Sequence, residues 1–137
     1  MGYRKDWATV PQAGGQGFYR TSKMLGRRVT ITAADNVSGN VVGAFMIPAG
    51  FVVSSILLVS TALGTGTVIN VGDSVINRYV AASTIAAAGG SVATLVGSPG
   101  LMFKNVNETE IQIGIGTGAG SPAAGTIDLY LIGFIDN

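Results

Sequence analysis

The stretch VVGAFMIPAGFVVSSILLVSTALGTGTVINVGDSV, residues 41–75, decides the fold. It holds no charged residue before Asp73, and two glycine-containing breaks, at 47–50 and 63–66, divide it into three apolar segments rich in Val, Ile and Thr. Because β-branched side chains pack well on a pleated sheet, each segment predicts a strand, and the long middle one should lie in the core. The three predicted strands are Val41–Ile47, Phe51–Ala62 and Thr67–Val71.

The same stretch must also be weighed as a membrane span. Val41–Leu63 is an uncharged run long enough to cross a bilayer as a helix. Pro48 and Gly50 interrupt it, however, no Lys or Arg flanks it, and the only tryptophan, Trp7, lies far away. We therefore expect strands here and no contact with a membrane.

The composition indicates one domain with too little charge to cover itself in water. The chain has 137 residues, of which 11% are charged and 47% are hydrophobic, whereas an ordinary soluble domain is about 25% charged. The excess apolar surface must be buried, and contacts between subunits are the most direct way to bury it. We therefore expect a homo-oligomer.

The absence of both histidine and cysteine restricts the chemistry of the chain. The commonest general base and metal ligand is missing, which rules out Ser-His-Asp and Cys-His nucleophile systems. Glu108 and Glu110 lack an acid/base partner, and Asp73 alone is too few carboxylates for calcium, so we interpret Asp73 as the cap of a turn. The sequence thus predicts no enzyme, no catalytic residue, no cofactor and no metal site.

Charge is distributed unevenly along the chain. Residues 1–28 hold six basic residues against one acidic residue, a net charge of +5, whereas residues 29–137 hold two basic against six acidic residues, a net charge of −4. We interpret residues 1–28 as an extended basic arm and residues 29–137 as a β-sandwich domain.

The arm mixes basic and aromatic side chains around a Pro/Gly hinge at 11–17. Arg and aromatic residues are typical of interface centres, so we predict that the arm binds a partner. The predicted contacts are Arg4, Lys5, Trp7, Phe18, Tyr19, Arg20, Arg27 and Arg28. A frayed, solvated terminus is the plain alternative. The basic residues are too dispersed for a strong nucleic-acid footprint, and no direct nucleic-acid contact is expected.

The rest of the chain alternates strands with turns. Period-two alternation predicts further strands, at Arg28–Ala33, Ser91–Val96, Glu110–Ile115 and Thr126–Ile135. Residues 81–88 fit either two short helical turns or a small-residue strand. The glycine-rich segment 114–120 is followed by no helix, so it predicts a hairpin loop and not a dinucleotide site. About eight strands separated by frequent turns are typical of an all-β sandwich or jelly roll.

The last predicted strand has no solvent face. Ile127, Leu129, Leu131 and Ile135 lie on one side of it, whereas the other side carries Asp128, Tyr130, Ile132 and Phe134. That second side is too apolar for water, so it should meet another sheet, the arm or another subunit.

The order of strands and turns resembles the capsid decoration (cement) proteins of tailed bacteriophages. The resemblance is carried by Ile47-Pro48-Ala49-Gly50, the apolar strand after it, Thr67–Asp73, the isoleucine strand Glu110–Ile115 and the final strand Thr126–Ile135. It implies a β-sandwich that trimerises on the outside of the head, bridges subunits of the major capsid protein and resists the pressure of packaged DNA. Similar sandwiches occur in head-fibre, tail and receptor-binding modules, which are the alternative.

Overall fold

The computed structural model describes residues 22–136, which form a two-layered β-sandwich. This part of the chain holds nine strands and one short helix. The elements are β1 Lys23–Ile31, β2 Val41–Ile47, β3 Phe51–Ser60, β4 Val68–Gly72, β5 Val80–Ser83, α1 Ile85–Ala88, β6 Gly90–Val92, β7 Lys104–Asn105, β8 Thr109–Thr117 and β9 Gly125–Ile135. The predicted all-β sandwich is therefore confirmed.

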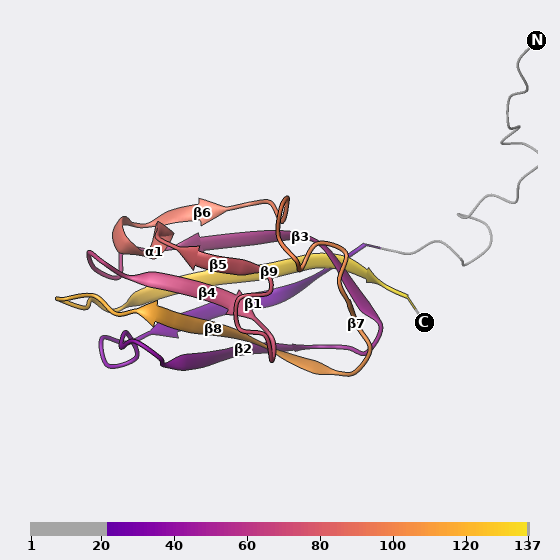
Figure 1. Cartoon of the computed structure of the whole chain (residues 1–137), viewed down its shortest axis with the longest axis horizontal. Helices are drawn as coiled ribbons and strands as arrows, with labels where there is room; N and C mark the ends of the chain where they lie inside the picture. Colours follow the sequence, from indigo (N-terminus) through magenta and orange to yellow (C-terminus); the bar gives the residue numbers. More distant parts are fainter. Residues whose placement is uncertain (1–21, 137) are drawn as a thin grey trace, which may run out of the picture.

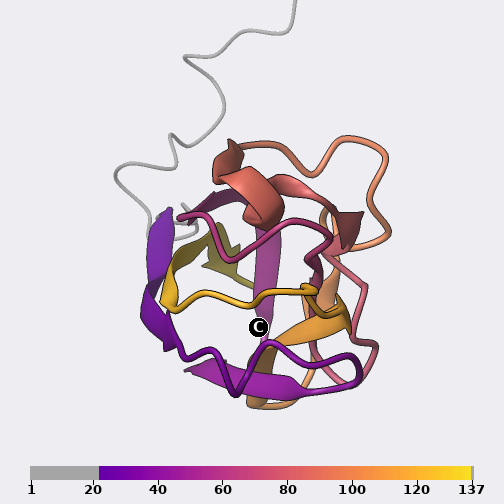
Figure 2. The ribbon, with the colours of Figure 1, turned by 90° about the vertical axis from the view of Figure 1, so that its left-hand side faces the viewer.

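The strands form two antiparallel sheets that face each other (Figures 1 and 2). Sheet A has the order β1-β9-β3-β6, with the short β7 also paired to β3, and sheet B has the order β2-β8-β4-β5. Apart from β7 and the β4–β5 hairpin, successive strands alternate between the two sheets, and the first and last strands are paired side by side in sheet A. This is the connectivity of a jelly roll.

The core lies between the sheets and follows from period two in each strand. In β9, Ile127, Leu129 and Leu131 are fully buried, and Ile111 and Ile113 face them from β8. Since successive side chains point to opposite sides of a sheet, each of these runs directs its odd-numbered residues inward. The predicted core strand β3 is central in sheet A, between β9 and β6.

The decisive stretch 41–75 forms strands, as predicted. β2 has the predicted bounds, β3 begins at Phe51 and ends two residues early at Ser60, and β4 is displaced by one residue. Because the Pro48–Gly50 turn carries the chain from sheet B to sheet A, the apolar run is divided between two layers. Residues 22–136 contain no helix of the length and apolarity that a bilayer crossing requires.

The first strand begins earlier than the sequence indicated. β1 starts at Lys23 and pairs with β9 over its whole length, from Lys23 opposite Gly133 to Ile31 opposite Gly125. The boundary predicted after residue 28 therefore falls inside a strand. Leu25, which was assigned to the arm, packs against the core, and this contact explains why pairing extends toward the N-terminus.

Two further assignments were incomplete or wrong. Residues 81–88 are neither one helix nor one strand, because the chain ends β5 at Ser83 and then makes the single turn of α1. The glycine-rich segment was expected to close a hairpin, but β8 lies in sheet B and β9 in sheet A. The loop therefore crosses between the layers, which the local glycine pattern cannot reveal.

Candidate interaction surfaces

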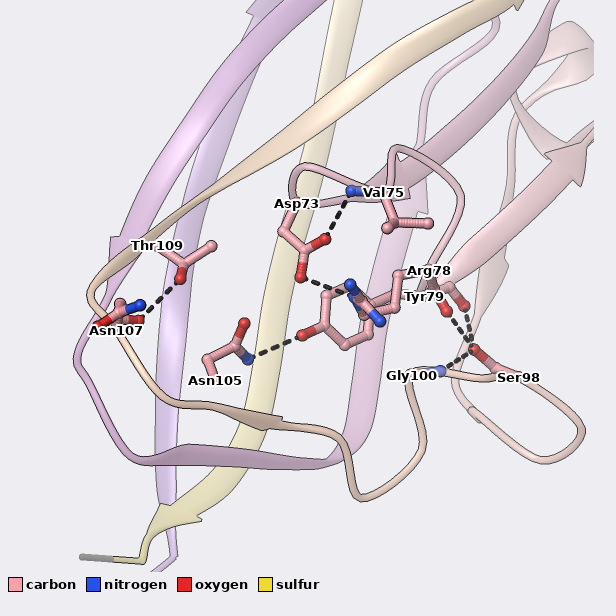
Figure 3. Close-up of polar contacts among 9 residues, drawn as sticks. All are labelled: Asp73, Val75, Arg78, Tyr79, Ser98, Gly100, Asn105, Asn107 and Thr109. Atoms are coloured by element: carbon pink, nitrogen blue, oxygen red, sulfur yellow. Dashed lines mark hydrogen bonds and ion pairs between the residues drawn. The ribbon is translucent and has the colours of Figure 1, made fainter.

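Three loops pack against one another toward the end of the sandwich where the described chain begins and ends, and the loop between β4 and β5 extends from there over the outer face of sheet B (Figures 1 and 3). The register defines this end, since Lys23 lies opposite Gly133, and Phe51 lies opposite both Ile135 and Asn105. The three loops, together called the loop platform, are residues 73–79, 95–103 and 105–109.

A buried ion pair organises the first loop of the platform. Asp73 Oδ1 accepts a hydrogen bond of 2.8 Å from the Val75 amide, which confirms the predicted turn cap. Arg78 Nε donates to Asp73 Oδ2 at 2.8 Å, with the two side chains 17% and 3% exposed, respectively. The Arg78 guanidinium also lies 3.7 Å from the centroid of the Phe103 ring, a cation–π contact that joins the first loop to the second.

Ser98 and Tyr79 tie the loops together (Figure 3). Ser98 Oγ lies 2.8 Å from the Arg78 carbonyl and 3.0 Å from that of Tyr79, and it accepts a bond from the Gly100 amide. Asn105 Nδ2 donates to the Tyr79 hydroxyl at 3.0 Å. Burial raises the pKa of Tyr79, although the bond from Asn105 opposes this effect. Side chains thus fix all three loops to one another.

The platform exposes apolar side chains. Of the six large hydrophobic residues that are exposed in loops of the described chain, five belong to it: Val75, Val96, Leu101, Met102 and Val106. Met102 has a φ of +60°, a left-handed conformation that is unfavourable for a residue with a side chain, and its amide donates to the Val53 carbonyl at 2.7 Å. The loop therefore holds an exposed methionine in a strained conformation.

The outer face of sheet A is a second apolar surface. The register places Met24 beside Ile132, and Tyr130 between Gly26 and Leu57. Met24, Leu57 and Val59 are exposed on this face. The even-numbered residues of β9 are half-buried on this face. The expectation that this side meets another sheet, the arm or another subunit stays a prediction.

A charged pair borders that apolar face. Arg28 Nε and Nη2 donate to the two carboxylate oxygens of Asp128 at 2.7 and 3.0 Å. The bond from Arg28 lowers the pKa of Asp128, and the bond to Asp128 raises the pKa of Arg28. Arg28, one of the predicted partner contacts, is therefore engaged within sheet A.

The other predicted contacts are placed only in part. Arg27 is exposed on β1. The remaining six, all of them in the first 20 residues of the chain, lie outside the described residues: Arg4, Lys5, Trp7, Phe18, Tyr19 and Arg20. The loop platform was missed altogether. Its only sequence signals are the acid and base of Asp73 and Arg78, five residues apart, and the turn 97–100, and neither signal indicates that the loops meet.

Whether a depression could serve as a ligand site depends on the reactive or charged side chains that it carries. A depression of about 340 Å³ lies over β2, β8 and β4, and its lining includes the amide side chains of Asn40, Asn70 and Gln112 beside Gly114 and Gly116. Asp73 also lines it, but Arg78 engages that carboxylate. Residues 22–136 contain no group of three or more His, Cys, Asp or Glu side chains that could hold a metal ion. Of the six aromatic residues in this range, Phe51 and Tyr79 are buried and the other four are partly exposed.

Comparisons with known proteins point to phage capsids. No protein-family model and no curated protein sequence matches the chain. A chain of the cyanophage Pam1 capsid asymmetric unit is similar, with a TM-score of 0.77 and 25% identity over 96% of this chain and 98% of that one. A chain of the capsid of Ralstonia phage GP4 shares the fold, with a TM-score of 0.69 and 22% identity over 84% of this chain and 86% of that one.

Proposed function

We propose that the chain is a structural, non-enzymatic component of a phage capsid and, more specifically, a decoration protein. It binds the outside of the assembled head as a homotrimer, contacts the major capsid protein and stabilises the shell. A protein that binds only the assembled shell adds its binding free energy to the stability of that shell. Linking three binding units in one trimer raises the avidity without a new kind of contact.

The similarity to a chain of the Pam1 capsid carries this proposal. It extends over nearly the whole of both chains, so it concerns the complete fold and not a shared fragment. The low charge of the chain agrees with a protein that buries apolar surface in an assembly.

The outer face of sheet A is the candidate surface for self-association. Leu57 and Val59 are exposed at the centre of the sheet, where a monomer would ordinarily present polar side chains. The ion pair of Arg28 with Asp128 supplies a polar border next to them. Apolar residues surrounded by polar ones are the ordinary anatomy of a protein interface.

Light scattering and shell binding test the two parts of the proposal. The purified protein should have a mass of three times 13.9 kDa, and Leu57→Glu should reduce it to that of a monomer. Deleting residues 1–17 should leave a folded oligomer, because β1 begins at Lys23, but should abolish binding to undecorated shells. A monomeric wild-type protein would refute the trimer, and normal decoration by the truncated protein would refute the role of the arm.

A further inference from the structure

We propose that the loop platform is the part of the body that faces the shell, so that the sandwich stands on the capsid with its strands pointing away from it. The inference rests on the proposed function and deepens it, because it names the docking surface and the chemistry of its partner. The partner that the loop platform contacts is the outer surface of the shell protein, in which shallow apolar depressions receive Met102, Val106 and their neighbours.

The platform is preorganised for binding. Asp73, Arg78 and Phe103 connect its first two loops, Tyr79 and Asn105 connect the first to the third, and Ser98 fastens the second loop to the backbone of the first. Loops that are already fixed lose little conformational entropy on binding, so more of the contact energy contributes to affinity.

The side chains on the platform are of the kind that interfaces use. Met102 is 53% exposed and Val106 is 73% exposed. Methionine adapts its shape to a partner and is enriched at interface centres. The positive φ of Met102 is a conformation that glycine or asparagine would adopt more easily, and strain of this type is typical of functional positions.

The position of the chain ends supports the same orientation. Residues 1–21, which hold six of the eight predicted partner contacts, precede Lys23 in the chain, and the start of β1 lies at the platform end. If the arm binds the shell, this end of the body is the nearest to it. At the opposite end, the loop between β8 and β9 contains only small or conformationally special residues, Gly118 to Ala124, and Val37 is the one large exposed apolar side chain in the described loops there.

Paired surface variants of the full chain test the orientation. The platform variant is Met102→Asn with Val106→Ser, and the matched control is Val37→Ser at the opposite end. Asn accepts a positive φ, so the platform variant should keep the wild-type mass and thermal stability. Binding is measured with undecorated shells assembled from the phage's own major capsid protein, as bound copies against free concentration. Removing two apolar side chains that the shell would cover should weaken binding at least about tenfold, and the control should change it less than about twofold.

The outcomes separate this inference from the function on which it rests. If wild-type protein does not bind shells, the proposed function fails before any variant is compared. If wild-type protein binds and the platform variant binds equally well, the function stands and the orientation is wrong. A loss in the Val37→Ser control equal to that in the platform variant would also overturn the orientation, because both ends would then contribute alike. Met102→Gly provides a second measurement, in which stability is kept or raised while shell binding falls.

Discussion

Replacing Arg78 by methionine should destabilise the body more than any other change of a single charge in residues 22–136. The substitution leaves the Asp73 carboxylate, 3% exposed, with the Val75 amide as its remaining hydrogen-bond donor. Breaking a fully buried ion pair costs about 3–5 kcal/mol. Since Arg78 is 17% exposed and water can approach the vacated position, we discount the cost to about 3 kcal/mol. Methionine keeps a sulfur–aromatic contact with Phe103, so little of that cost arises from lost packing.

A double-mutant cycle isolates the pair. Asp73→Asn retains the Oδ1 acceptor for the Val75 amide but loses the charge-assisted bond, a cost of about 1.5–3 kcal/mol. In the double variant no buried charge is left unpaired, so its total cost should be about 2 kcal/mol, well below the sum of the two single variants. Lys104→Met is the matched control. The Lys104 ion pair with Asp136 is longer, at 3.9 Å, and exposed, so its removal should change stability by less than about 0.5 kcal/mol.

Urea denaturation followed by circular dichroism measures these free energies, provided that the slope with denaturant stays constant across the four proteins. The Arg78→Met variant should also melt on the order of 10 °C lower than the wild type. Additive costs in the cycle, or an Arg78→Met variant within about 0.5 kcal/mol of wild type, would show that the pair does not organise the platform.

Two further predictions concern the described body. Tyr79→Phe should cost about 1–3 kcal/mol in the same urea assay, because it leaves the buried Asn105 Nδ2 without its acceptor. Because the pKa of Tyr79 is raised in the folded state, its contribution to the free energy of unfolding is fully present below the ordinary tyrosine pKa and is lost as the pH rises through the folded-state pKa. The wild type should therefore lose stability more steeply than Tyr79→Phe as the pH rises in the alkaline range. Gly133→Ala should cost about 3 kcal/mol or prevent folding, because its Cβ would lie 1.9 Å from the Val52 carbonyl oxygen. Gly43→Ala is the control and should be nearly neutral, because its Cβ would meet only the movable carboxylate end of the Glu110 side chain. Equal thermal stability of these two glycine variants would contradict the packing argument.

Local pattern was sufficient for most strands because their signals lie within single segments. β2 could be located to the residue, since Val41–Ile47 is bounded by a polar turn on one side and by Pro48 on the other. The start of β1 could not, because Lys23 and Arg27 interrupt the alternation that Leu25 and Val29 continue. Pairing with β9 overrides those two charges, and pairing is a property of residues about 100 positions away.

The loop platform could not be predicted for the same reason. Asp73 was correctly interpreted as a turn cap, because its contact with Val75 is local. Its second oxygen, however, binds Arg78, and the platform is completed by Ser98 and Asn105, which are 19 and 26 residues from Tyr79. Only the fold brings these residues together, and no composition signal marks them.

The two apolar surfaces explain why so little charge suffices for this chain. A jelly roll of this length buries its core with alternating strands and does not require apolar residues on its outer faces. Eight of the eleven large hydrophobic residues that are exposed in residues 22–136 lie in two places, the outer face of sheet A around Leu57 and the loop platform around Met102, whereas Val37, Val41 and Met46 lie elsewhere. One surface runs along the strands and the other closes their end, so contact through one does not obstruct contact through the other. The proposed trimer on a shell would bury both surfaces, whereas a monomer in water would leave both exposed.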